Sequence, residues 1–179
     1  MKLLYRFSYC SIAILIILSF NNVSLAGFKG NSIRLTIESP RIIDGPHEAI
    51  VDESIEFELQ KENNVVEVDI DISENTIYFD YSRSSSNLFA SGTFNGYIFS
   101  DINNSLPNIE NVEIIDSETT LGINEDRITF NENQIFINVA SLPVNKQSRI
   151  KITVHFSPSE RNLFFPIKSK ENKVIIICM

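Results

Sequence analysis

Apolar and polar residues alternate along most of this sequence, beginning at Ile33. Ile33, Leu35 and Ile37 occupy every second position of the segment Asn31–Ser39. Successive side chains of a β-strand point to opposite faces, so the pattern predicts a strand with one buried face. Similar runs predict further strands at Ser54–Gln60, Val66–Ile72, Ile77–Tyr81, Ser91–Asp101, Asn111–Asp116, Arg127–Phe130, Gln134–Ala140, Arg149–Phe156 and Lys173–Cys178.

Turn-forming residues separate these runs. The Asp-Gly-Pro of Ile43–Pro46 predicts a turn, because proline fixes φ and aspartate and glycine favour turns. A polar turn at Lys61–Asn64 would join two of the strands into a hairpin, and Asn131–Asn133 predicts another tight turn. We expect loops at Ser82–Asn87 and Leu142–Lys146. The proline in Asn162–Ile167 indicates an edge or an irregular segment there.

The number and spacing of these strands determine the expected fold. About eight to ten short strands follow one another, and no long run after the N-terminus has helical periodicity. Each strand has one apolar face, which two sheets bury by covering one another. The sequence therefore predicts an all-β protein, a two-layer antiparallel β-sandwich of jelly-roll or immunoglobulin-like type. No linker composition interrupts residues 27–179, so we expect one domain.

The segment Ser91–Asp101 combines three aromatic residues with two glycines and is expected to be a central strand. Its side chains divide into Phe94, Gly96 and Ile98 on one face and Asn95, Tyr97 and Phe99 on the other. Aromatic residues on both faces suit a strand that is covered on both sides or lies at the centre of a sheet. Glycine inside a strand marks a bulge or the close approach of another group.

Two interpretations of this segment remain open. In the first, Asn95, Tyr97 and Asp101 line a binding groove. In the second, the glycines make room for neighbouring aromatic side chains, and the segment serves the core. The sequence favours the second, because buried aromatic residues dominate core energetics.

The run Phe94–Asp101 resembles a segment of uncharacterised secreted bacterial β-rich proteins. There a Phe-Asn-Gly-aromatic-hydrophobic-Phe run precedes a proline-containing turn and further strands. Pro107, Gly122–Thr129 and Ile135–Ala140 stand in similar order here, and the resemblance extends from Ile70 to Phe156. It implies a secreted β domain and assigns no catalytic residue.

The first 26 residues have the composition of a secretory signal peptide. Lys2 and Arg6 precede an apolar run at Ile12–Phe20, and Ser24-Leu25-Ala26 supplies small residues two positions apart. We expect cleavage after Ala26 and export to the periplasm or the extracellular medium. The apolar run is shorter than the ~20 residues of a transmembrane helix, so no membrane anchor is expected in the mature chain.

The charge of the mature chain limits the classes of partner that it is expected to bind, and its cysteine content limits its disulfide bonds. Two of the 15 basic residues lie in the leader, so residues 27–179 carry 13 basic and 23 acidic residues and a formal charge of −10. An acidic surface disfavours binding to nucleic acid and to anionic lipid. Cys10 leaves with the leader, so Cys178 has no partner for an intramolecular disulfide, and we expect it to be buried or inert.

Few residues suggest chemistry. Asp101 and Asn103 offer oxygen atoms at alternate positions of a candidate calcium site, although Leu106 and Val112 replace the glycine and glutamate of an EF-hand loop. No other cofactor is expected. His47 and His155 are too few for a zinc site and are interpreted as surface residues.

The carboxylates Glu67, Asp69 and Asp71 share one strand face, about 7 Å apart in successive pairs. That spacing is compatible with glycoside hydrolysis, but the sequence favours a solvated acidic face as its explanation.

The sequence thus favours an exported, non-catalytic domain of bacterial type that acts in binding, adhesion or envelope structure, with a protein or a glycan as its partner. Two alternatives stay open. One is a secreted hydrolase that uses the strand carboxylates, and the other is a small outer-membrane β-barrel, whose girdles of aromatic residues the sequence does not show clearly.

Overall fold

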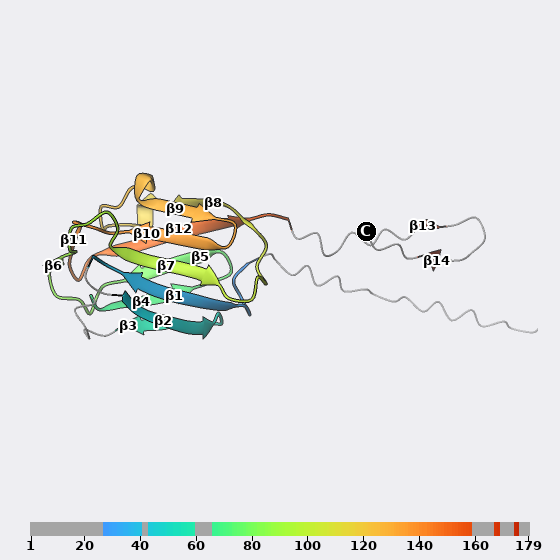
Figure 1. Cartoon of the computed structure of the whole chain (residues 1–179), viewed down its shortest axis with the longest axis horizontal. Coiled ribbons are helices and arrows are strands. Elements are labelled where there is room, and N and C mark those ends of the chain that lie inside the picture. Colours follow the sequence, from blue (N-terminus) through green and yellow to red (C-terminus); the bar gives the residue numbers. More distant parts are fainter. Residues whose placement is uncertain (1–26, 41–42, 60–65, 159–166, 169–173, 176–179) are drawn as a thin grey trace, which may run out of the picture.

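The computed structural model describes residues 27–40, 43–59, 66–158, 167–168 and 174–175. Within these ranges the chain forms two five-stranded antiparallel sheets that pack face to face, and no α-helix (Figure 1). The predicted two-layer β-sandwich is therefore confirmed.

The first sheet has the strand order β2-β1-β7-β10-β9. Its strands are β2 (Ile43–Ile50), β1 (Ser32–Glu38), β7 (Gly96–Asp101), β10 (Gln134–Asn138) and β9 (Ile128–Asn131). The second sheet has the order β3-β4-β5-β12-β8. Its strands are β3 (Phe57–Leu59), β4 (Val68–Ile72), β5 (Thr76–Asp80), β12 (Arg149–Phe156) and β8 (Ile109–Ile114).

The connections between the sheets carry the remaining elements. β6 (Asn87–Leu88) pairs with β11 (Pro143–Val144) at one end of the sandwich (Figure 1). The 3-10 helices η1 (Asp116–Glu118) and η2 (Glu125–Arg127) lie between β8 and β9. Because the chain crosses from one sheet to the other after β2, β5, β7, β8 and β10, segments distant in sequence meet at the ends of the sandwich.

Aromatic side chains join the two sheets. Phe79 of β5 lies with its ring centre 5.0 Å from that of Tyr97 and 5.9 Å from that of Phe99, both on β7. Tyr81 packs between Phe79 and Phe89. Tilted and edge-to-face contacts of this kind add to the stabilisation from burying the rings.

β7 is the third of five strands in the first sheet, so the predicted central position is confirmed. Tyr97 and Phe99 face the core, whereas Ile98 on the other face is half-buried. Of the two arrangements that its aromatic residues suggested, the centre of a sheet is the one observed. An added Cβ at Gly96 would lie 1.8 Å from the carbonyl oxygen of Ile137 on β10, so glycine is needed for close backbone approach.

The predicted turn at Ile43–Pro46 is wrong, because these residues begin strand β2 at the edge of the first sheet. The pairing of β2 with β1 shifts register between Leu35 and Ile37, opposite Gly45 and the cis-linked Pro46. An edge strand tolerates the missing N–H of proline at such a bulge. The left-handed φ of +102° at Gly45 suits glycine and bends the strand there.

Other boundaries differ less. Only Phe57–Leu59 of the predicted strand Ser54–Gln60 pairs with β4, which confirms the hairpin but shortens it. β11 lies inside the expected loop Leu142–Lys146. Val174–Ile175 (β14) pairs with Ile167–Lys168 (β13) and joins neither large sheet.

The leader Met1–Ala26, the whole turn Lys61–Asn64, most of Asn162–Ile167, and Cys178 lie outside the described residues.

Candidate functional site

A cavity of about 480 Å³ opens at the end of the sandwich where β6 and β11 pair. It is bounded by the end of β1, the start of β7, the segment before β4, and the segment from β6 to Ser91. The described residues that line it are Ile37, Ser39, Pro40, Val66, Asn87, Leu88, Phe89, Ala90, Ser91, Asn95, Gly96, Tyr97 and Val139. The volume is within the range of small-molecule sites, and none of these side chains is charged.

Of the three residues named by the groove interpretation, Asn95 and Tyr97 lie in the wall of this cavity, whereas Asp101 does not. They reach it because Asn95 immediately precedes β7, where the chain leaves the sheet. The Asn95 Nδ2 donates to the carbonyl oxygen of Ala90 at 2.8 Å, and its backbone N–H donates to Asn138 Oδ1 at 3.2 Å. These bonds fix the side chain, which is only 7% exposed.

The amide oxygen of the Asn95 side chain, Oδ1, is not used in these bonds. Within the described ranges, no hydrogen bond is donated to Asn95 Oδ1. No described side-chain nitrogen or oxygen is completely buried without a partner. Asn95 Oδ1 is therefore accessible, and it is the side-chain acceptor of a nearly buried residue that belongs to the cavity wall.

Tyr97 belongs to a pair of buried hydroxyl groups. Tyr81 Oη donates to Tyr97 Oη at 3.2 Å, across the interface of the two sheets. Burial raises the pKa of both phenols, well above the ordinary value for Tyr81. Both hydroxyls stay protonated, so the pair contributes one mutual hydrogen bond and one further O–H donor.

Asp101, at the opposite end of β7, organises the loop that follows. Its Oδ1 accepts hydrogen bonds from the Asn103 N–H at 3.1 Å and from Ser105 Oγ at 3.3 Å, and its Oδ2 accepts one from the Leu106 N–H at 2.8 Å. Both carboxylate oxygens are thus occupied by the loop itself, as in turns that begin with aspartate.

Among the described residues, no cluster of acidic side chains forms around the candidate calcium site. In the part of the chain that the structure describes, no three His, Cys, Asp or Glu side chains gather as metal ligands would. Calcium at Asp101 and Asn103 stays a prediction from the sequence.

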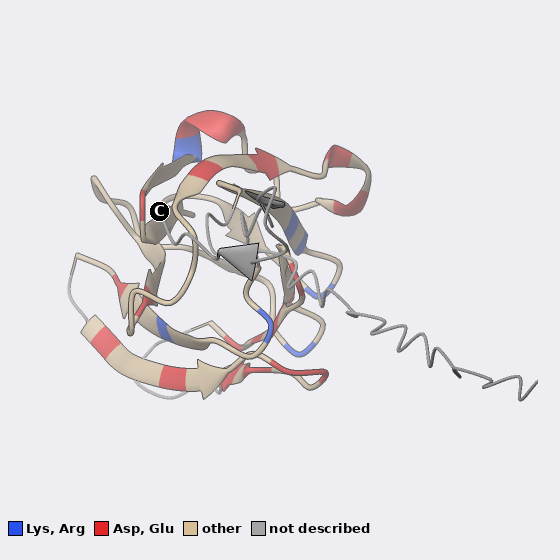
Figure 2. Ribbon diagram, turned by 90° about the vertical axis from the view of Figure 1, so that its right-hand side faces the viewer, with Lys and Arg blue, Asp and Glu red and all other residues tan. Residues whose placement is uncertain are grey.

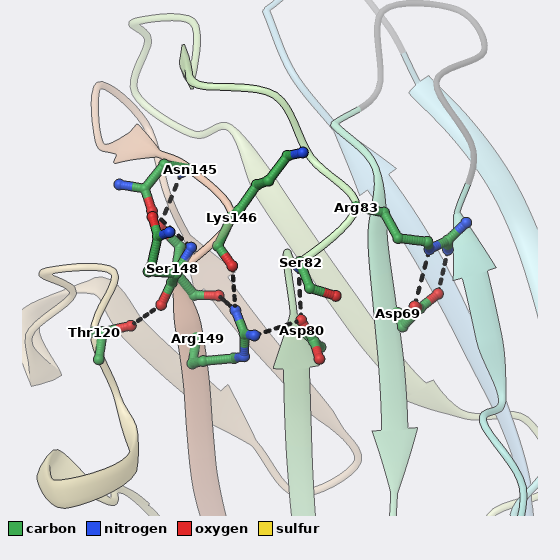
Figure 3. Close-up of polar contacts among 10 residues, drawn as sticks. Asp69, Asp80, Ser82, Arg83, Thr120, Asn145, Lys146, Ser148 and Arg149 are labelled. Carbon is green, nitrogen blue, oxygen red and sulfur yellow. Dashed lines mark hydrogen bonds and ion pairs between the residues drawn. The ribbon is translucent and has the colours of Figure 1, made fainter.

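The strand carboxylates of the hydrolase alternative lie on the outer face of the second sheet, outside the cavity. Figure 3 shows Arg83 against Asp69 and Arg149 against Asp80. Asp69 lies opposite both Glu58 and Asp80 on the neighbouring strands. Like charges at opposite positions destabilise a sheet, and the two arginines offset this repulsion. Asp69 therefore has a structural explanation.

The two histidines are also paired. His47 Nε2 lies 3.0 Å from Asp44 Oδ2 on β2, and His155 Nε2 lies 3.5 Å from Glu113 Oε2 on the outer face of the second sheet. His155 is exposed, as the sequence predicts, whereas His47 belongs to a strand instead of a turn. Neither lines the cavity.

The acidic residues are spread over several strands and loops (Figure 2). One of them, Glu56, is partly buried, and its desolvation raises the pKa of the carboxyl group. Its oxygens accept from the backbone N–H groups of Ile72 and Asp52, at 2.6 and 3.1 Å. Through these hydrogen bonds, Glu56 links the segment that precedes β3 to strand β4.

Sequence reasoning missed most of the cavity wall. Leu88 is 62% exposed and follows the serine-rich loop, so a lone apolar residue after a polar run was its only signal. Val139 and Ile37 look like ordinary core residues in the sequence. Their place in the cavity depends on where β1 and β10 end in space.

The fold defines this chain as a β-sandwich domain. Comparisons with protein-family models, with curated proteins and with solved structures each gave no match. The resemblance to secreted bacterial β-rich proteins therefore stays a prediction. Among the described residues, no helix is long and apolar enough to cross a lipid bilayer.

Proposed function

We propose that this chain is an exported β-sandwich domain that acts by binding, and that the cavity beside β6 is its binding site. The observation that carries the proposal is the cavity itself, whose described wall combines apolar and uncharged polar side chains with the accessible oxygen of Asn95. Small-molecule sites have this composition, in which a few fixed polar groups orient a ligand within an apolar enclosure.

Binding is favoured over catalysis by the position of the titratable groups. Glu67, Asp69 and Asp71 lie outside the described cavity wall, and so do His47 and His155. Asp69 is paired with Arg83, and the histidines lie against Asp44 and Glu113. The wall offers amide, hydroxyl and apolar groups, which recognise a ligand without transferring its protons. Export is supported by the basic, apolar and small-residue order of Met1–Ala26.

The test compares the wild type with a variant whose cavity is filled. Ala90 is an exposed residue of the wall, so Ala90→Trp is expected to occupy the cavity without disturbing the core. Both proteins are expressed with the leader, recovered from the exported fraction and analysed by native mass spectrometry for bound molecules. We expect adducts on the wild type and their loss in Ala90→Trp, with an N-terminus at Gly27.

Ser85→Trp serves as the matched control, because Ser85 is exposed in the same loop but does not line the cavity. Equal adducts on the wild type and Ala90→Trp would overturn the cavity as the binding site. An intact leader on the recovered protein would overturn export.

A further inference from the structure

The cavity wall contains a polar side chain, Asn95, and only one end of its amide group has a hydrogen-bond partner among the described residues. Asn95 is more than nine-tenths buried, and its Nδ2 is held by the Ala90 carbonyl oxygen. That bond also fixes which end of the amide is oxygen, because only the NH₂ group can donate to a carbonyl. The Oδ1 consequently points away from Ala90 as an acceptor that has no donor among the described residues.

An acceptor in such a position selects for a donor. A nearly buried amide oxygen that loses contact with water and gains no partner costs free energy when a ligand covers it. A ligand that places an N–H or O–H group there avoids this cost. A ligand of the same shape without the donor does not, so the position discriminates between the two.

The remaining wall determines the rest of the ligand. Ile37, Pro40, Val66, Phe89 and Val139 supply apolar surface. None of the described lining residues is charged, so this part of the wall gives a charged ligand no opposite charge in return for its lost hydration. Phe89 and Tyr97 are buried in the core and show little of their rings, which leaves no open aromatic platform for stacking a sugar.

We propose that the cavity binds a neutral, largely apolar small molecule that donates one hydrogen bond, through N–H or O–H, to Asn95 Oδ1. This inference rests on the proposed function and adds the chemical class of the ligand.

Indole and benzofuran test the hydrogen bond directly. The two molecules have nearly the same shape, but indole has an N–H donor where benzofuran has an ether oxygen. Each is titrated into ¹⁵N-labelled wild type and followed by amide chemical shifts. We expect saturable shifts centred on Asn95, Gly96 and Val139, with indole losing about fivefold to tenfold in affinity in Asn95→Leu while benzofuran changes little.

Comparing both probes across the same substitution cancels their different hydrophobicity. Asn111→Leu is the matched control, because Asn111 is exposed on β8 and lies outside the cavity wall. If Asn95→Leu does not fold, Ala90→Trp replaces it, and we expect this variant to abolish the shifts from both probes. Tryptamine and indole-3-acetate, the cationic and anionic relatives of indole, are expected to bind more weakly than indole.

Several results would overturn the inference. Equal losses for indole and benzofuran in Asn95→Leu would remove the role of the Asn95 oxygen. Tighter binding of either charged relative would contradict a neutral ligand. Absence of saturation by either neutral probe, or a change in oligomeric state on filling the cavity, would indicate a polypeptide occupant instead. Adducts that are lost in Ala90→Trp but prove to be charged would refute this inference while leaving the proposed function intact.

Discussion

The two ends of β7 carry the two polar residues that the sequence singles out, and they differ in how their hydrogen bonds are used. At the end of the strand, both oxygens of Asp101 accept from the loop that follows. At the start, Asn95 has its Nδ2 engaged and its Oδ1 accessible in a cavity. Asp101 uses both of its acceptor oxygens within its own loop, whereas Asn95 keeps one acceptor oxygen that a ligand can use. Polar residue type alone does not distinguish these roles.

The largest effect is expected at the cavity end, from Gly96→Val. The added Cβ would lie 1.8 Å from the Ile137 carbonyl oxygen, which belongs to the backbone and cannot move alone. We expect the free energy of unfolding in urea to fall by about 3 kcal/mol, at the upper end of overpacking effects.

Gly30→Asn is the control, because an added Cβ at Gly30 meets no atom within 4 Å and asparagine tolerates its positive φ. Its expected cost is below about 1 kcal/mol. Equal stabilities of the two variants would show that the close approach at Gly96 does not constrain the sheet.

The buried tyrosine pair should give the next largest effect. Tyr97→Phe leaves the hydroxyl of Tyr81 buried without its partner, at an expected cost of about 1–3 kcal/mol. Replacing both tyrosines with phenylalanine removes both polar groups, so the double variant should recover most of that loss. A double variant less stable than Tyr97→Phe would contradict this account.

The same pair predicts a fall in stability at high pH. Burial raises the pKa of both phenols above the ordinary value of 10.0. Above pH 10 the unfolded chain releases these protons while the folded chain keeps them, so the free energy of unfolding decreases as pH rises. Urea titrations between pH 9 and about pH 11 measure the slope. We expect a flatter slope in the double phenylalanine variant, and an unchanged slope would assign the effect to other groups.

At the opposite end of β7, Asp101→Ala removes the acceptor for two backbone N–H groups and one hydroxyl. We expect a loss of about 1.5 kcal/mol in the free energy of unfolding. The loss should be the same in calcium and in a chelator, because the loop already occupies the carboxylate. A stabilisation by calcium that appears in the wild type and disappears in Asp101→Ala would support the calcium site instead.

The smallest effect is expected for a carboxylate paired on the outer face of the second sheet. The Arg83 and Asp69 side chains are 33% and 19% exposed, so a double-mutant cycle with Arg83→Met and Asp69→Asn should give a coupling of about 1 kcal/mol. Salt should weaken it. The exposed pair Lys29–Glu53 is the control, and its coupling is expected to be smaller, because solvent screens both charges. Equal couplings would show that burial contributes nothing to the first pair.

Alternation alone determined most of the architecture. Every second position of the segments around Ile33, Ile70 and Ile152 is apolar, and each segment forms a strand whose apolar side is buried. The hairpin of β3 and β4 followed from the same pattern, and the central position of β7 followed from the aromatic residues on both of its faces. Local periodicity suffices here because a strand needs only one buried face.

The tertiary structure alone decided which strands are neighbours and where the cavity lies. Ile43–Pro46 became part of a strand because β1 offered an edge with which a proline-containing segment can pair at a bulge. Ile37, Leu88 and Val139 are distant in sequence and meet only because the chain crosses repeatedly between two sheets. Residue pattern encodes the faces of each strand, whereas the cavity depends on non-local packing at the ends of the sandwich.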